Sequence, residues 1–108
     1  MSNSKEIIIS IDAMGGDLGP QAAIDGAIIA SKKVSNVKFI FFGNKKKIDF
    51  YIKKKKFKNI YNIVDTSQVI SNETKPTDAL RKYKNSSMFR AVQSVKDGKS
   101  HAIVSSGN

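Results

Sequence analysis

Short, almost wholly apolar runs alternate along this chain with longer segments of helical periodicity. This order is typical of βα units, in which parallel strands form a sheet and the connecting helices cover it. Because parallel sheets are usually covered on both faces, we expect the first, isoleucine-rich strand to be buried on both sides. The chain is therefore predicted to have an α/β fold, a parallel sheet with flanking helices. The runs expected to be strands are residues 6–12, 38–42, 60–64 and 101–104.

The helices are predicted from apolar residues that recur at three- and four-residue spacing. Pro20 suits the first position of a helix, and the apolar stripe behind it is expected to face the sheet. The best-defined helix covers 87–97, with Ser86 or Ser87 as N-cap and Gly98 as C-cap. Elsewhere we predict helices from residue 20, over 45–56 and over 77–83, and a loop over 66–75.

A chain of 108 residues is long enough for one domain. The absence of cysteine excludes disulfides, thiolate metal sites and a cysteine nucleophile, and the single histidine, His101, excludes a multi-histidine metal centre. No run has the length of a signal or membrane-spanning segment, so the cytoplasm is the expected compartment. The predicted fourth strand lacks the helix that should follow it. We therefore expect residues 1–108 to be the N-terminal part of a single α/β domain, truncated after strand four.

Positive charge is concentrated in one segment of the chain. The formal net charge is +10, and eight lysines lie between residues 45 and 58. One interpretation is a helix with a solvated basic face, and the other is a surface that binds nucleic acid or anionic lipid. The segment lacks the arginines and the glycine-rich or aromatic patterns of nucleic-acid motifs, which favours the first interpretation. A basic binding module stays open as the alternative to an enzyme.

The segment 12–20 joins the first strand to the first helix and contains three glycines and a proline. Backbone N–H groups of such a loop are suited to hold a phosphate. The dinucleotide fingerprint requires glycine at the position of Met14 and an acidic residue where the second strand ends, at Gly43 and Asn44. A nicotinamide- or flavin-dependent oxidoreductase is therefore disfavoured. Two roles stay open for Asp12, bracing of the loop and a polar contact with substrate.

Two further segments carry donors for an anion. Arg81 and Lys84 precede Ser86 and Ser87, so that cations and hydroxyls gather where a helix is predicted to begin. Residues 105–108 follow the fourth strand and supply hydroxyl, amide and backbone donors. Since the carboxyl ends of parallel strands meet at one edge of a sheet, we expect both segments and the glycine loop to converge on one tetrahedral anion.

Three ordered motifs in this chain resemble those of the bacterial phosphate acyltransferases, the PlsX family of fatty acid and phospholipid synthesis proteins. The motifs are residues 9–17 with Gly19-Pro20, then Lys75-Pro76, Arg81, Lys84 and 86–88, and finally 104–108. Together they extend over essentially the whole chain. The resemblance implies a Rossmann-like α/β fold similar to that of isopropylmalate dehydrogenases and phosphotransacetylases.

The resemblance also implies an activity and a set of partners. A member of this family moves a fatty acyl group from acyl carrier protein to inorganic phosphate, and releases acyl phosphate for a glycerol-3-phosphate acyltransferase. The family implies a homodimer without cofactor or metal, cytoplasmic and associated peripherally with the inner face of the cell membrane. On this interpretation the basic helix contacts the acidic carrier protein or anionic lipid, and not nucleic acid. We expect the 108-residue chain alone to be inactive.

Attack of phosphate on a thioester requires a held dianion and donors for the charge that develops on the carbonyl oxygen. No protein nucleophile is needed. We expect the catalytic residues to be Asp12, Arg81, Lys84 and Asn108, and the substrate-binding residues to be Gly15, Gly16, Ser86, Ser87, Ser106 and Gly107. His101 is expected to be structural.

Overall fold

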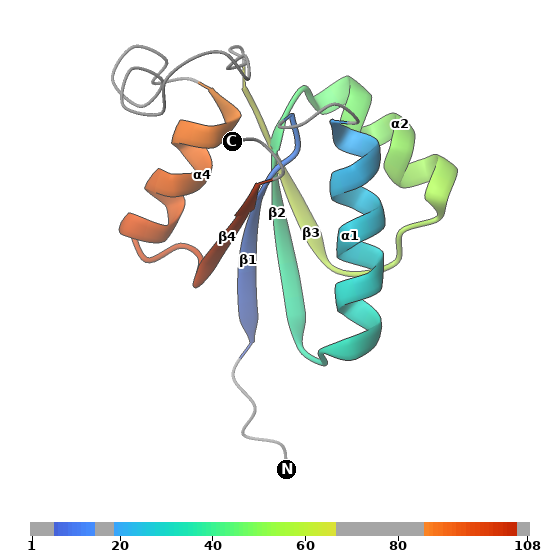
Figure 1. The fold of residues 1–108 in the computed structure, drawn as a ribbon, viewed down its shortest axis with the longest axis horizontal. Helices are drawn as coiled ribbons and strands as arrows, with labels where there is room; N and C mark the ends of the chain where they lie inside the picture. The colour runs from blue at the N-terminus through green and yellow to red at the C-terminus, as the bar shows by residue number, and fades with distance from the viewer. Residues whose placement is uncertain (1–5, 15–18, 67–85, 106–108) are drawn as a thin grey trace.

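A computed structural model describes residues 6–14, 19–66 and 86–105 of the chain. Its four strands are β1 (Ile7–Asp12), β2 (Val37–Gly43), β3 (Tyr61–Asp65) and β4 (Ala102–Ser105). They form one sheet of order β3-β2-β1-β4, in which every neighbouring pair is parallel (Figure 1). The predicted α/β class with a parallel sheet is confirmed. The strand order is the one found in the first four strands of a doubly wound, Rossmann-like sheet.

The helices of the described residues are α1 (Pro20–Lys33), α2 (Lys45–Lys55) and α4 (Ser87–Lys96). Figure 1 shows α1 and α2 on one face of the sheet and α4 on the other. Helices lie on both faces because the connections between parallel strands are right-handed and the chain changes direction along the sheet. It runs from β1 through β2 to β3 and then returns past β1 to β4. Pro20 occupies the first helical position, as predicted. None of these helices has the length and apolar character needed to cross a membrane.

The face under α1 and α2 holds the apolar core. Phe39 and Phe41 of β2 are almost completely buried. The ring of Phe57 meets both edge-on, with centroid distances of 5.8 Å. From α2, Ile48 and Ile52 complete the cluster at a spacing of four residues, which directs the lysines of that helix to solvent. The predicted amphipathic basic helix is confirmed.

The face under α4 contains buried hydroxyl groups. Ser10 of β1 donates a hydrogen bond to Ser100 Oγ at 2.7 Å, and Ser100 donates to Ser94 Oγ of α4 at 3.2 Å. All three side chains are buried. A hydroxyl both donates and accepts, so serines in a row satisfy one another in the interior. Ala91, also buried, lets α4 lie close to the sheet.

Several predicted boundaries shift by one residue. β2 extends one residue further at each end, β3 begins one residue later, and β4 runs from Ala102 instead of His101. His101 lies just before β4, where its backbone N donates to Ile8 O at 2.7 Å and its Nδ1 accepts from Ile8 N at 3.0 Å. These two hydrogen bonds give His101 the structural role expected of it.

Two predictions about burial and capping need correction. β1 is buried on both faces only toward its end, since Ile7 is 39% exposed and Ile8 and Ile9 are half-buried. The reason is that β4 is short and pairs with β1 only from Ile9 onward. The C-cap of α4 is Asp97, and Gly98 follows it with a φ of 76°, a conformation that favours glycine. Of the predicted loop 66–75 only the first residue is described, and the predicted helix 77–83 lies outside the described residues.

Candidate functional site

Asp12 is the centre of a polar cluster at the carboxyl edge of the sheet. Its side chain is 4% exposed. Oδ1 accepts hydrogen bonds from Ser87 Oγ at 2.5 Å and from the backbone N of Met14 at 3.1 Å, and Oδ2 accepts from Ser105 Oγ at 2.9 Å. One carboxylate thus joins the end of β1, the loop after it, the start of α4 and the end of β4. We call Asp12, Ser87 and Ser105 the Asp12 cluster.

The sheet order explains why these residues meet. Asp12 and Ser105 are 93 positions apart in sequence, yet they are register partners in the parallel pair β1–β4. The chain leaves β1 toward β2 on one side and arrives at β4 on the other, so the direction of the connections reverses between these two strands. Open α/β sheets bind their ligands at the carboxyl ends of strands at such a reversal.

The N-terminus of α4 lies against the Asp12 carboxylate. Of the two predicted N-cap residues, Ser86 takes the position, since its Oγ accepts from Phe89 N at 3.1 Å. Ser87 is the first helical residue, is buried, and donates its hydroxyl to Asp12. The N–H groups of Ser87 and Met88 have no carbonyl partner within the helix and lie at the positive end of its dipole. Negative charge is therefore stabilised at this point.

The beginning of the glycine loop is anchored on β2. Ala13 N donates to Phe42 O at 2.9 Å, and the sulfur of Met14 accepts from Asn44 N at 3.4 Å. Gly43 makes this contact possible, because a Cβ there would lie 2.7 Å from Met14 Cγ. With the hydrogen bond from Met14 N to Asp12, these contacts fix the direction in which the chain leaves β1. Bracing of the loop, one of the two roles left open for Asp12, is thus observed.

The structure describes three of the predicted site residues and brings two of them, Asp12 and Ser87, into direct contact. The third, Ser86, caps the same helix start. Ser105 belongs to the segment 105–108 that was predicted to supply donors, although it was not named among the substrate-binding residues; in the structure its hydroxyl donates to Asp12. The remaining predicted site residues lie outside the described part of the chain: Gly15, Gly16, Arg81, Lys84, Ser106, Gly107 and Asn108.

The end of β2 does not supply a ribose-binding carboxylate. Asn44 follows the strand and caps α2, its Oδ1 accepting from Lys47 N at 3.1 Å. Within residues 6–14, 19–66 and 86–105 there is also no group of three or more acidic, histidine or cysteine side chains placed to hold a metal ion.

Comparisons with known proteins agree with the resemblance in the motifs. The model of a family described as "Fatty acid synthesis protein" matches residues 7–108. The chain is 41% identical over 105 residues to a phosphate acyltransferase of Saccharophagus degradans, which covers 97% of this chain and 31% of that protein. It is 43% identical over 100 residues to the phosphate acyltransferase of Pediococcus pentosaceus, covering 93% of this chain and 28% of the relative. A third, from Clostridium botulinum, is 37% identical over 103 residues, covering 94% of this chain and 31% of the relative.

The chain spans about three tenths of the length of these relatives. The match nevertheless includes every described strand and helix, and therefore the whole Asp12 cluster. The chain belongs to the family of fatty acid synthesis proteins that includes these phosphate acyltransferases.

Proposed function

We propose that this chain provides the phosphate-binding side of an acyltransferase, which moves a fatty acyl group from acyl carrier protein to inorganic phosphate. The product is an acyl phosphate, a precursor for phospholipid synthesis. Two findings support the proposal: relatives that carry the name phosphate acyltransferase, and a cluster of fixed polar groups at the sheet edge where α/β proteins bind anions.

The reaction makes specific demands on such a site. A phosphate oxygen attacks the thioester carbonyl carbon, the carbonyl oxygen becomes negative, and the carbon–sulfur bond then breaks. The carrier-protein thiolate leaves and takes up the proton released by phosphate. The nucleophile is the substrate itself, so the protein must hold the dianion in position and stabilise the oxyanion. Donors that are already oriented do this at the lowest reorganisation cost.

The observation that carries the proposal is the set of hydrogen bonds on Asp12. Both of its oxygens accept hydrogen bonds from residues of this edge. We infer that Asp12 is a positioning residue: it holds the start of α4, the end of β4 and the loop after β1 in one arrangement. The N–H groups of the first turn of α4 then face the same edge and are suited to bind phosphate.

The test uses a chimaera in which this chain replaces the matching segment of the Saccharophagus degradans phosphate acyltransferase. Phosphate-dependent loss of the acyl carrier protein thioester is measured, and acyl phosphate is trapped with hydroxylamine. Ser87→Ala removes one hydrogen bond to a charged group and should raise the KM for phosphate at least about tenfold. Ser87→Thr, which keeps the hydroxyl, should have a KM for phosphate close to that of the unsubstituted chimaera.

The matched control is Ser31→Ala, which removes a serine whose hydroxyl donates to Ile28 O within α1. This variant should leave the KM for phosphate unchanged. Thioester loss that does not depend on phosphate would contradict the proposed reaction. Equal KM values for Ser87→Ala and Ser31→Ala would contradict the location of the phosphate site.

We also propose that the outer face of α2 docks the acidic carrier protein. Phe50 is 58% exposed and has Lys46, Lys47, Lys53 and Lys54 as its neighbours three and four residues away along the helix. Lys54 Nζ lies 5.9 Å from the Phe50 ring centroid. An apolar side chain surrounded by cations is complementary to an acidic surface with an apolar spot.

Replacing these four lysines by Gln should weaken carrier-protein binding and flatten its dependence on salt. The control is Lys32→Gln with Lys33→Gln, two exposed lysines in the last turn of α1, which should change binding little. Lys55 is left intact because it pairs with Asp25 at 3.3 Å. Salt-steep binding of DNA or RNA by the same lysines, without binding of carrier protein, would favour the basic binding module instead.

A further inference from the structure

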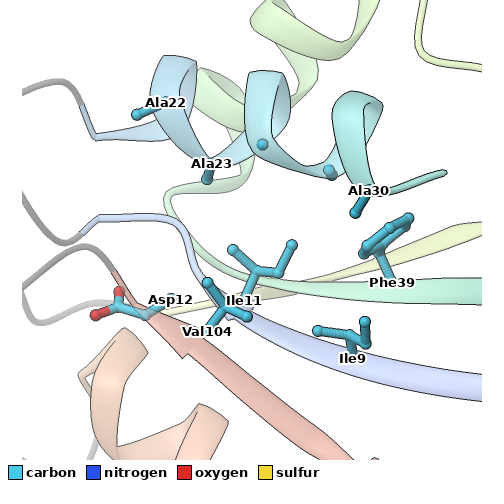
Figure 2. Close-up of a pocket in the computed structure, with 10 residues that line it drawn as sticks. Ile9, Ile11, Asp12, Ala22, Ala23, Ala30, Phe39 and Val104 are labelled. Atoms are coloured by element: carbon cyan, nitrogen blue, oxygen red, sulfur yellow. The ribbon is translucent and has the colours of Figure 1, made fainter. Parts of the chain in front are cut away.

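An apolar groove of about 160 Å³ lies between α1 and the sheet. Its floor consists of Ile9 and Ile11 of β1 and their neighbours on the adjoining strands, Phe39 and Val104 (Figure 2). Val104 is paired in register with Ile11, so both side chains point to the α1 face, and Val104 is 55% exposed. In the described part of the chain α1 covers β1 and β2 but leaves β4 open, which makes one side of the groove accessible.

The groove exists because the side chains of α1 above it are small. Ala22, Gly26 and Ala30 follow one another at a spacing of four residues, so they lie in one row along the helix. Ala23 and Ala27 form the adjacent row. Small side chains in both rows leave space that larger ones would fill.

Gly26 is the most informative residue of this row. It lies in the interior of α1, where glycine is a poorer helix former than alanine. Its backbone does not adopt a positive φ, and a Cβ added there would meet nothing within 4 Å. Neither backbone geometry nor close packing within the described residues therefore requires glycine. What glycine does provide is open space on the helix face that lines the groove.

The groove ends at the candidate site. Asp12 lies at one end of the groove, at the carboxyl edge of the sheet, and its carboxylate, the centre of the Asp12 cluster, lies on the α4 side of that edge. Figure 2 shows Asp12 at one end of the lining residues, with Ile9, Phe39 and Ala30 toward the other. A ligand that follows this path has a polar, anionic end at the sheet edge and an apolar tail between α1 and β1. That is the chemistry of a fatty acyl group activated on phosphate.

We propose that this groove binds the first carbons of the fatty acyl chain, with the carbonyl and phosphate end beside the Asp12 cluster. This inference rests on the proposed function, since it places the second substrate of the same site. A cavity of about 150 Å³ is enough to hold a six-carbon ring, so a groove of about 160 Å³ takes about six carbons. The rest of a longer chain lies beyond the groove.

The test measures binding of n-alkyl phosphates from ethyl to decyl to the 108-residue chain. Each methylene that enters the groove should tighten binding about fourfold, up to about six carbons, after which the affinity should level off. Gly26→Leu fills the groove and should abolish the gain with chain length, while leaving the affinity for inorganic phosphate unchanged. Gly26→Ala is the matched control and should keep most of the gain.

A second variant distinguishes a filled groove from a misfolded chain. Ala30→Leu narrows the end away from Asp12, so the affinity should still rise but level off at a shorter chain. Circular dichroism and thermal unfolding of each variant establish that α1 is intact. An affinity that does not depend on chain length, or that rises equally in Gly26→Leu and Gly26→Ala, would overturn the proposal.

The same measurements separate this inference from the proposed function. If the chimaera transfers no acyl group to phosphate but the gain with chain length is present and lost in Gly26→Leu, the groove stands and the reaction does not. If the chimaera transfers the acyl group to phosphate but inorganic phosphate and all alkyl phosphates bind equally, the proposed reaction is supported and the groove proposal is contradicted. If Gly26→Leu changes binding to the chain but not the acyl-length preference of the chimaera, another segment fills the groove in the longer protein, and the proposal fails.

Discussion

The two faces of the sheet differ in their buried polar side chains. Under α1 and α2 the strands present aromatic and branched side chains, such as Phe39 and Phe41, that pack without hydrogen bonds. Under α4 the apolar partners Ile40 and Phe42 lie beside two buried polar side chains, Ser10 and Asp12, and each of these two is hydrogen-bonded to a serine. Apolar packing tolerates small displacements, whereas a hydrogen bond needs a defined distance and direction. The apolar face therefore supplies most of the stability, and the polar face sets the positions of the groups at the carboxyl edge.

The contribution of the apolar face to stability is tested most directly at Phe41, which is fully buried and contacts the rings of Phe39, Phe57 and Tyr61. Phe41→Ala should lower the free energy of unfolding by about 3–5 kcal/mol, measured by urea denaturation. Phe50→Ala, at a 58% exposed position, is the control and should change it by less than about 0.5 kcal/mol. Similar values for the two variants would show that the apolar face is not the main source of stability.

Asp12→Asn tests the polar face. The amide has a single acceptor oxygen and no charge, so it cannot keep the hydrogen bonds from Ser87, Ser105 and Met14 together. We expect the free energy of unfolding to fall by about 1.5–3 kcal/mol. Asp25→Asn removes a carboxylate from a surface ion pair and should cost less than about 0.5 kcal/mol. A loss no larger than that of the control would mean that the Asp12 cluster does not brace this edge.

The smallest effect is expected in the row of serines. Ser100→Ala removes the acceptor for Ser10 and the donor to Ser94, and should cost about 1–1.5 kcal/mol. Replacing all three serines by alanine should cost less than the sum of the single changes, because no unpaired hydroxyl is then left behind. Strict additivity in denaturation experiments would show that the three hydroxyls act independently.

The order and type of the elements could be predicted from sequence because they depend on local patterns. The spacing of Ile48 and Ile52 identified α2, and Pro20 marked the start of α1. The start of β4 was predicted one residue early because His101 directly precedes the apolar run 102–104, although it lies just before the strand, where its backbone and side chain hydrogen-bond with Ile8. That contact joins residues 93 positions apart, and no local pattern contains it.

The site was predictable in part for the same reason. Asp12 at the end of a strand and Ser87 at the start of a helix are local signals. The side chains that hydrogen-bond to the Asp12 carboxylate meet there because β4 lies next to β1. Strand order of this kind cannot be predicted from any single segment of the sequence. The buried row of Ser10, Ser94 and Ser100 was missed, although a serine within an isoleucine-rich strand is itself a sign that a buried partner exists.

The central position of β1 has a consequence for how the protein is made. β1 is followed closely in sequence by its neighbour β2, but its other neighbour, β4, begins only at Ala102. At ordinary rates of translation this interval lasts roughly 5–20 s, far longer than a hairpin or helix needs to form. During that time one edge of β1 is unpaired, and a nascent chain in this state is a substrate for chaperones and a risk for aggregation.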